Sequence, residues 1–343
     1  MPIMDRDVLN VPVLIIAEIG VNHNGDVSLA KKLIKIAKDA GADIAKFQAF
    51  RTKDLVTSSA AMAAYQEKNT GNFNTQFDML MNYEFSAAQF ADLFNYCREI
   101  GIEFLATAFD DESFQLIQQI GSERIKIPSG EITNLPYLKQ IANARKEIIL
   151  STGMSTLIEV EEAIEKLEEF GSQRQNITIL HCTSSYPAPI EEVNLRAMVK
   201  MGDFFGTKIG YSDHTLGTEV AIAAVSLGAC IIEKHLTLDR ELPGPDHKAS
   251  LEPAEFQEMV RGIRNIELAL GSDIKAPTKS EISTMQSARK SLIAIDSIRA
   301  GDVFTIQNIG AKRPGGGISP MRWDQYIGRR ASRDYTIDDL IFE

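Results

Sequence analysis

Cysteine is scarce in this chain of 343 residues, and so is net positive charge. The three cysteines, Cys97, Cys182 and Cys230, are too few and too scattered for a disulfide framework or a cysteine-rich zinc site. There are 36 Lys and Arg against 47 Asp and Glu, which gives a net charge of −11 without a long basic run. Such a chain is poorly suited to bind nucleic acid or an anionic membrane. An anionic substrate would therefore need a local cluster of positive charge.

Long apolar runs are also missing. The run at 11–17 is far shorter than a membrane span. The first six residues, Met-Pro-Ile-Met-Asp-Arg, lack the architecture of a signal peptide. We therefore expect a cytoplasmic protein with no membrane partner.

Short β-branched runs alternate with longer amphipathic stretches from residue 13 to about residue 270. Helical patterns at 28–40, 157–170 and 219–227 are examples of the longer stretches, and glycines follow several of them. The apolar runs are 13–20, 43–50, 102–109, 124–130, 147–153, 177–184, 208–214 and 230–237. Eight such units in about 250 residues predict an α/β fold of the (β/α)8 barrel type. A doubly wound open sheet shows the same alternation and is the competing architecture.

Two segments depart from this alternation. The connection between Phe50 and Ser86 is long and polar, which is typical of a lid or a substrate wall, although a surface insertion would look the same. After Gly271 the composition changes to short strand-like pieces broken by turns. The sequence thus predicts a barrel domain at 1–271, a linker at 272–282 and a small β-rich domain at 283–343.

Histidines gather at the expected strand ends, where barrels of this type carry their chemistry. His23, His181, His214 and His235 all lie there, and His214 and His235 end adjacent strands. Two neighbouring imidazoles with open positions suit a divalent metal that also binds a substrate oxygen. Two hydrogen-bonded core histidines are the alternative.

Cations and hydroxyls surround the same mouth of the barrel. Lys46, Lys126, Ser129, Ser151 and Ser212 have the composition of a phosphate or carboxylate site and would supply the local positive field. Two carboxylates, Glu18 and Glu131, fall inside this ring. They are either ion-pair partners of the lysines or groups that transfer protons.

A set of motifs runs from the first expected strand to the last residues: Glu-Ile-Gly-Val-Asn-His-Asn-Gly (18–25), Lys-Ile-Pro-Ser-Gly-Glu (126–131), Ser-Thr-Gly-Met (151–154), His-Cys-Thr-Ser (181–184), Tyr-Ser-Asp-His-Thr (211–215), Glu-Lys-His (233–235), Gly-Pro-Asp-His (244–247) and Lys-Arg-Pro-Gly (312–315). Together these motifs resemble the bacterial sialic acid synthase family. The resemblance implies a TIM barrel followed by an antifreeze-like (SAF) domain, in a domain-swapped homodimer. It also implies an enzyme that condenses phosphoenolpyruvate with an N-acylated mannose-type sugar, giving a nine-carbon 2-keto acid and phosphate.

The same resemblance assigns roles to individual residues. It implies that His214 and His235 bind Mn²⁺ or Mg²⁺, that Glu18 and Glu131 are catalytic, and that Arg313 reaches the active site of the partner chain. Some family members carry Asn where this chain has Ser184. The implied phosphoenolpyruvate contacts are Lys46, Thr107, Lys126, Ser129, Ser151, Ser184 and Ser212, and the implied sugar contacts are Gln48, Tyr186, Asp246 and Arg313.

The sugar itself is open between two candidates. N-acetylmannosamine would give N-acetylneuraminate, whereas 2,4-diacetamido-2,4,6-trideoxymannose would give N,N'-diacetyllegionaminate. The stretches 130–137 and 246–253 resemble legionaminate synthases, which favours the second sugar.

Two rival functions remain at this point. A Schiff-base aldolase on the same barrel would use Lys126 or Lys46 as its nucleophile. A carbohydrate- or ice-binding protein would follow from analogy with the C-terminal domain alone, and it would leave the polar ring without a use.

Overall fold

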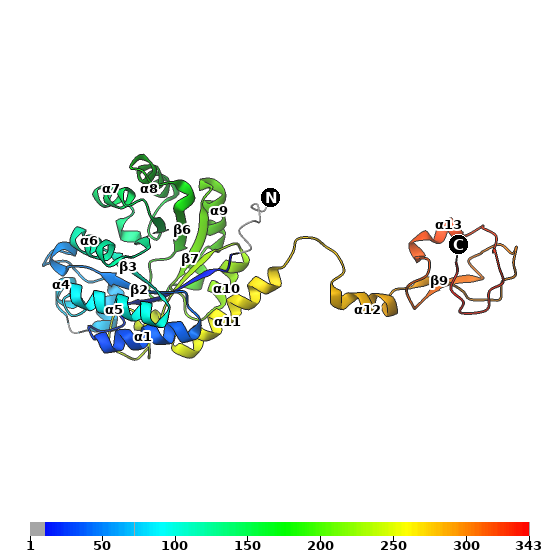
Figure 1. Ribbon diagram of the computed structural model, residues 1–343, viewed down its shortest axis with the longest axis horizontal. Coiled ribbons are helices and arrows are strands. Elements are labelled where there is room, and N and C mark those ends of the chain that lie inside the picture. The colour runs from blue at the N-terminus through cyan, green and yellow to red at the C-terminus, as the bar shows by residue number, and fades with distance from the viewer. Residues whose placement is uncertain (1–10, 72, 343) are drawn as a thin grey trace. The chain divides into compact units, whose positions relative to one another are not determined.

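Eight parallel strands close into a barrel in the computed structural model, which describes residues 11–71 and 73–342 (Figure 1). The strands pair in chain order, and β8 returns to β1 with Glu18 opposite His235. The strands are β1 (Leu14–Gly20), β2 (Ile44–Ala49), β3 (Glu103–Ala108), β4 (Arg124–Ile127), β5 (Glu147–Ser151), β6 (Ile177–Cys182), β7 (Lys208–Asp213) and β8 (Ile231–His235). The predicted (β/α)8 barrel is confirmed, and the doubly wound open sheet is excluded.

Amphipathic helices cover the outside of the barrel (Figure 1). Their ends follow local signals: Ser86 and Gln89 form a capping box at the start of α5, and Gly41 ends α1 with a φ of 91°. The helices are α1 (Val27–Ala40), α5 (Ala87–Ile100), α6 (Asp111–Ile120), α7 (Leu135–Asn143), α8 (Leu157–Glu169), α9 (Leu195–Phe205), α10 (Glu219–Ser226) and α11 (Pro253–Leu270). Their apolar faces pack against the outward-facing residues of the strands.

The barrel interior has an apolar floor. Side chains alternate along each strand between the helices and the interior, so every second residue points inward. The floor residues form one buried cluster: Ile16, Ile44, Leu105, Ile149, Leu180 and Ile231. The next inward-facing positions lie nearer the carboxyl ends of the strands, and that is where polar residues begin.

The connection between β2 and α5, residues 51–86, is the β2–α5 segment. It was expected to be a long polar loop, but it contains three short helices: α2 (Thr52–Leu55), α3 (Ala64–Thr70) and α4 (Gln76–Leu80). Met79, Leu80 and Tyr83 from this segment are buried in a cluster with Val21 and Phe50. The segment therefore has its own apolar interior. Its residue Asn72 lies outside the described residues.

A second compact unit begins at Ser272 and has its own core, which includes Leu292, Phe304 and Tyr335. Its two strands pair antiparallel. Helix α12 starts inside the range that the sequence assigned to a linker. The elements are α12 (Lys279–Ala288), β9 (Ser291–Ala294), β10 (Ile309–Lys312) and α13 (Trp323–Tyr326).

Within residues 11–71 and 73–342, none of the helices combines the length and the apolar character needed to cross a membrane. The N-terminal residues 1–10, on which the expectation about a signal peptide rests, lie outside the described part of the chain.

Candidate active site

A buried polar layer lies two residues beyond the apolar floor along each strand. The alternation that turns Ile16, Ile44 and Ile231 inward also turns Glu18, Lys46 and Glu233 inward. The same step leads from other floor residues to Thr107, Ser151 and Cys182. These side chains are all buried. The strand period thus places charges and hydroxyls at one level of the barrel, directly above an apolar floor.

Two lysines and two carboxylates form the centre of this layer. The Nζ of Lys46 lies 2.8 Å from Oε2 of Glu18 and 3.4 Å from Oε2 of Glu233. The Nζ of Lys126 lies 3.7 Å from Oε1 of Glu233. Glu233 therefore bridges the two lysines. Removing one member of such a buried set leaves an uncompensated charge, which is costly.

The two carboxylates differ in their affinity for a proton. Burial raises the pKa of Glu18 above its ordinary value, despite the opposing charge of Lys46. Burial acts in the same direction on Glu233, but Lys126 and Lys46 outweigh it and lower the pKa of that carboxyl to about 2. Burial also lowers the pKa of Lys126. Glu233 is thus fixed as an anion, whereas Glu18 holds a proton more readily than an ordinary glutamate.

Hydroxyl groups surround the charged centre. Lys126 donates to Oγ of Ser151 at 2.6 Å, and Lys46 donates to Oγ1 of Thr107 at 3.2 Å. Ser212 donates to Oε1 of Glu233 at 2.8 Å. These lysines and hydroxyls, predicted as an anion site from the sequence, do lie together around one buried volume.

Ser129 and Ser184 border the same volume from the ends of β4 and β6. The Oγ of Ser129 accepts from the backbone N–H of Gly153 at 2.9 Å and lies 3.3 Å from Sγ of Cys182. A Cβ on Gly153 would lie 2.3 Å from Oγ of Ser184 and 2.9 Å from Oγ of Ser129. The hydroxyls of Ser129 and Ser184 can therefore lie this close to residue 153 because that residue is glycine.

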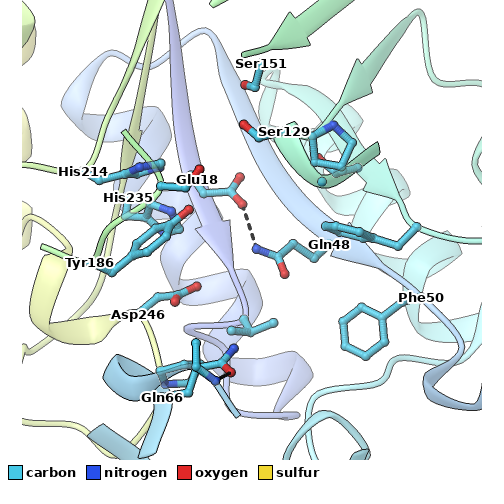
Figure 2. Close-up of a pocket in the computed structure, with 18 of the residues that line it drawn as sticks. Glu18, Gln48, Phe50, Gln66, Ser129, Ser151, Tyr186, His214, His235 and Asp246 are labelled. Atoms are coloured by element: carbon cyan, nitrogen blue, oxygen red, sulfur yellow. Dashed lines mark hydrogen bonds between the residues drawn. The ribbon is translucent and has the colours of Figure 1, made fainter. Parts of the chain in front are cut away.

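His214 and His235 lie side by side at the ends of β7 and β8, with ring centroids 5.5 Å apart (Figure 2). Burial lowers the pKa of both imidazoles, and that of His235 falls well below its ordinary value. The Nδ1 of His214 lies 2.7 Å from the carbonyl oxygen of Thr183, which fixes the ring. The Nδ1 of His235 is buried and has no hydrogen-bond partner among the described residues.

This pair fits a divalent metal, because both rings are buried, adjacent and neutral. Within the described part of the chain, no group of three or more His, Cys, Asp or Glu side chains is arranged to hold a metal ion. The protein would therefore supply two imidazoles, and water or substrate oxygens would complete the coordination.

The other histidines have structural partners. His23 is stacked on Phe85 with ring centroids 4.0 Å apart, and Nε2 of His181 lies 2.6 Å from the carbonyl oxygen of Val193. Nδ1 of His247 lies 2.7 Å from Oγ1 of Thr237. Position at a strand end therefore does not separate the first two of these histidines from His214 and His235, whereas adjacency of two strand ends does.

A cavity of about 530 Å³ opens above the charged layer. Tyr186 lies against His214 with ring centroids 4.2 Å apart, and Asp246 faces the same space (Figure 2). Gln48 donates to Oε1 of Glu18 at 3.4 Å, which places its amide at the boundary between the charged layer and the cavity (Figure 2). The three barrel residues expected to contact a sugar, Gln48, Tyr186 and Asp246, thus line one cavity.

Asp246 is buried in this cavity, and burial together with the nearby charge of Glu18 raises its pKa to about 7. The folded protein therefore keeps this proton across a pH range in which the unfolded chain, with a pKa near 3.8, has lost it. The contribution of Asp246 to stability is present below about pH 4 and is lost as the pH rises to about 7.

Asp246→Asn removes this dependence and should change the pH profile of stability. Between pH 4 and pH 7, we expect the free energy of unfolding of the wild type to fall relative to that of Asp246→Asn by at most about 1.4 kcal/mol per pH unit. The thermal midpoint of the wild type should fall with it. Thermal unfolding of both proteins across that range measures it. A gap between the two midpoints that stays constant with pH would show that Asp246 is not protonated at neutral pH.

Glu131 does not occupy the position expected from the sequence. It was predicted to be a buried carboxylate beside the lysines, but it is half-buried in a 3₁₀ turn, Ser129–Glu131, at the rim of the cavity. Its Oε2 accepts from Nδ2 of Asn134 at 2.5 Å, and it forms no ion pair among the described residues. Glu233, which sequence reasoning missed, holds the central position instead. The period-two alternation from His235 would have identified it as inward-facing.

Arg313 lies in the second unit, directly after β10, and is exposed. Its neighbour Lys312 pairs with Asp338 at 2.7 Å, whereas Arg313 has no hydrogen bond or ion pair with any described residue. The turn that follows is fixed, because the N–H of Gly315 donates to the carbonyl of Gln286 in α12 at 2.7 Å. Arg313 thus projects from an ordered turn.

Comparison with known proteins gives two family matches. Residues 33–275 match the NeuB family and residues 289–342 match the SAF domain. The chain is 51% identical over 330 residues to N,N'-diacetyllegionaminic acid synthase of Campylobacter jejuni, covering 96% of this chain and 99% of that protein. It is 43% identical to the protein of the same name from Legionella pneumophila, covering 93% of this chain and 90% of that protein.

Solved structures agree with the family match. The crystal structure of N-acetylneuraminic acid synthetase from Leptospira borgpetersenii, in complex with citrate, is 35% identical with a TM-score of 0.70, and it covers 80% of this chain and 91% of that chain. A truncated 3-deoxy-D-arabino-heptulosonate 7-phosphate synthase from Thermotoga maritima, 16% identical with a TM-score of 0.57, shares the fold; it covers 76% of this chain and 89% of that chain.

Proposed function

The chain belongs to the NeuB family and carries a SAF domain, and on that basis we propose that it condenses phosphoenolpyruvate with an N-acetylated mannose-type sugar. The products are a nine-carbon 2-keto sugar acid and phosphate. The observation that carries the proposal is the buried layer of two lysines and several hydroxyls beneath a cavity of about 530 Å³. Such a layer suits a small dianion, and the cavity above it leaves room for a second substrate.

Phosphoenolpyruvate would lie on the polar layer. The ammonium groups of Lys46 and Lys126 are charge-assisted donors for its phosphate and carboxylate. The hydroxyl groups that would complete the contacts belong to Thr107, Ser129, Ser151, Ser184 and Ser212. The apolar floor beneath excludes water from this side, so the interactions act in a medium of low dielectric.

The reaction balances as a condensation with water. The alkene carbon C3 of phosphoenolpyruvate forms a bond to the aldehyde carbon C1 of the sugar, and the aldehyde oxygen takes up a proton to become a hydroxyl. A water oxygen adds at C2 and loses a proton. The C–O bond to phosphate then breaks, and the second proton of the water leaves as the C2 ketone forms.

Glu18 is the group that we assign to the water proton, with Glu131 at the cavity rim as the other candidate. Glu18 is buried between Lys46 and Gln48, and its raised pKa suits a group that takes up a proton. Glu233, with its lowered pKa, stays ionised and holds the two lysines in place. We therefore treat Glu233 as a positioning residue.

The imidazoles of His214 and His235 would hold Mn²⁺ or Mg²⁺ at the cavity. A bound divalent ion would supply Lewis-acid polarisation of the sugar aldehyde. The charge of the site supports this assignment, because Glu18 and Glu233 offset the two lysines before any anionic substrate arrives. Additional positive charge is then needed for phosphoenolpyruvate to bind.

We propose 2,4-diacetamido-2,4,6-trideoxymannose as the sugar, with N,N'-diacetyllegionaminate as the product. Identity of 51% and 43% to two proteins named for that product supports this choice over N-acetylmannosamine. The test is to incubate the purified protein with phosphoenolpyruvate, Mn²⁺ and each sugar while following phosphate release. Two outcomes would contradict the proposed reaction: phosphate release in the absence of any sugar, and no phosphate release with either of the two sugars. A cytoplasmic location goes with the proposal, since phosphoenolpyruvate is made there.

Lys126→Met is expected to weaken phosphoenolpyruvate binding selectively. Hydrogen bonds to charged groups contribute roughly 1.5–3 kcal/mol, so the KM for phosphoenolpyruvate should rise at least about tenfold. The KM for the sugar should change much less. Steady-state kinetics with each substrate varied in turn measures both. A parallel rise in the two KM values would point to a general structural role for Lys126.

A Schiff-base aldolase is the second candidate function, and the lowered pKa of Lys126 favours it. Borohydride added during turnover distinguishes the two chemistries. The proposed condensation leaves the protein mass unchanged, whereas a Schiff base would leave a covalent adduct on Lys126 or Lys46.

We also propose that the protein works as a domain-swapped homodimer, in which Arg313 of one chain contacts the sugar bound to the barrel of its partner. The support is the family membership together with an exposed arginine that projects from an ordered turn. The planar guanidinium suits hydrogen bonding to the hydroxyl and acyl oxygens of a sugar.

A further inference from the structure

The cavity has two walls of different chemistry. One wall is the polar layer of lysines, hydroxyls and histidines at the strand ends. The other comes mainly from the β2–α5 segment and includes an apolar wall, with Leu55, Val56 and Leu80 facing the cavity next to Phe50. The same segment also lines the cavity with polar groups, those of Gln66, Gln76 and Tyr83. Figure 2 shows Phe50 across the open space from Asp246 and Gln66. A ligand in this cavity therefore meets polar groups at one end and hydrocarbon at the other.

The apolar wall is packed in place by the rest of the barrel. Phe50 and Leu80 belong to a buried cluster, and Phe50 meets Phe109 edge to face with ring centroids 6.5 Å apart. One hydrogen bond joins the two ends of the segment, since Oε2 of Glu84 accepts from the N–H of Thr52 at 2.8 Å, and another ties it to the loop after β8, where Nδ2 of Asn69 donates to the carbonyl of Pro245 at 2.8 Å. The wall is thus a formed surface with a fixed shape.

The amide oxygen of Gln66, which lines the same cavity, is already engaged. The Oε1 of Gln66 accepts from the N–H of Ala63 at 2.9 Å and from Nε2 of Gln76 at 3.4 Å. A sugar hydroxyl placed against Leu55, Val56 and Leu80 would lose its water without gaining a partner there, which is unfavourable. A methyl group in the same place would bury apolar surface.

The orientation of the sugar follows from the chemistry. Its aldehyde carbon C1 must lie beside phosphoenolpyruvate at the polar wall, so C4, C5 and C6 extend toward the opposite wall. The two candidate sugars differ at that end. N-acetylmannosamine carries hydroxyls at C4 and C6, whereas the diacetamido-trideoxy sugar carries an acetamido group at C4 and a methyl at C6.

We infer that the apolar wall formed by Leu55, Val56 and Leu80 is the specificity-determining surface for the distal end of the sugar, and that it selects a C6 methyl and a C4 acyl methyl over hydroxyls. This inference rests on the proposed condensation. A hydrophobic pocket discriminates against an added hydroxyl by about 10- to 100-fold, which is the preference expected in kcat/KM.

The test compares two glutamine variants of the β2–α5 segment. Leu55 and Met62 both pack, partly buried, against the same apolar cluster, but of these two residues Leu55 borders the cavity and Met62 does not. We expect Leu55→Gln to lower the ratio of kcat/KM for the diacetamido-trideoxy sugar over N-acetylmannosamine about tenfold. Met62→Gln should destabilise the segment to a similar degree and leave that ratio unchanged. Leu55→Met should restore the ratio.

Further measurements keep the inference falsifiable. Val56→Thr replaces a methyl of the wall with a hydroxyl at nearly constant volume, and it carries the same test if Leu55→Gln does not fold. 2-Acetamido-2,6-dideoxymannose isolates the C6 methyl and should be a better substrate than N-acetylmannosamine. Equal ratios in Leu55→Gln and Met62→Gln, or a wild type that prefers N-acetylmannosamine, would overturn the inference. If neither sugar leads to phosphate release, the proposed function itself is contradicted.

Discussion

His235→Ala is expected to lower kcat by on the order of a thousandfold or more, since a bound divalent ion supplies several kcal/mol of transition-state stabilisation. The imidazole is buried beside His214, and its Nδ1 has no hydrogen-bond partner in the described part of the chain, which supports the proposal that this ring binds the ion. His214→Ala should have the same effect. EDTA should abolish the activity of the wild type, and Mn²⁺ should restore it.

A binding measurement separates loss of the metal from loss of the fold. Equilibrium dialysis with Mn²⁺ should show binding to the wild type and none to His235→Ala, while thermal unfolding shows that both are folded. His181→Ala is the matched control, because His181 ends β6 and contacts the backbone of Val193 away from the pair. It should keep both Mn²⁺ binding and turnover. A metal-free His235→Ala protein with full activity would refute the assignment.

The barrel could be predicted from the sequence because its determinants are local. The observed β1 at Leu14–Gly20 and β8 at Ile231–His235 lie inside the ranges expected from the apolar runs. The helix that follows the β2–α5 segment begins after Ser86, as its capping box requires. Alternation of hydrophobicity and capping are properties of neighbouring residues, so they can be read without knowing the three-dimensional arrangement.

The charged centre of the site was only partly accessible in this way. Glu18 and Lys46 lie near the ends of adjacent strands, and their pairing across β1 and β2 follows from the barrel. The expectation that Glu131 is buried beside the lysines was wrong for a geometric reason. Glu131 lies beyond the end of β4 in a 3₁₀ turn, which breaks the alternation, whereas Glu233 is within β8 and keeps it.

The β2–α5 segment shows a second limit of sequence reasoning. Its three short helices of four to seven residues carry too few turns for a periodic signal. Its apolar residues Met79 and Leu80 lie far along the chain from Phe50 and meet it only through the fold. The sequence indicated a lid or a substrate wall here, but the apolar character of that wall could not be predicted before the structure was known.

Arg313→Ala is expected to lower kcat/KM for the sugar by about 10- to 100-fold, because a hydrogen bond to a charged group contributes roughly 1.5–3 kcal/mol. Arg313 is exposed and has no hydrogen bond or ion pair among the described residues, so its removal should leave the stability of the second unit unchanged. The thermal midpoint of the variant checks this. A large loss of stability would indicate a structural role instead.

Mixing two defective proteins tests whether the arginine acts on its own barrel or on that of a partner. His235→Ala and Arg313→Ala are combined in equal amounts under conditions in which dimers exchange, and random pairing makes about half of the dimers mixed. In a domain-swapped dimer, the barrel with intact histidines receives Arg313 from the His235→Ala chain. One of two sites in each mixed dimer is then complete, and activity should recover to about a quarter of the wild-type value.

The control mixture combines two variants that each lack one of the two histidines of the same metal site. His235→Ala and His214→Ala remove the two imidazoles that lie 5.5 Å apart, so no pairing of these chains rebuilds a complete site. That mixture should stay inactive under identical conditions. If each site uses the arginine of its own chain, the first mixture will also stay at the sum of its parts, because every site keeps one defect. If activity recovers only in the first mixture, Arg313 must act across the dimer. If activity does not recover although the protein is a dimer that exchanges subunits, the proposal is contradicted.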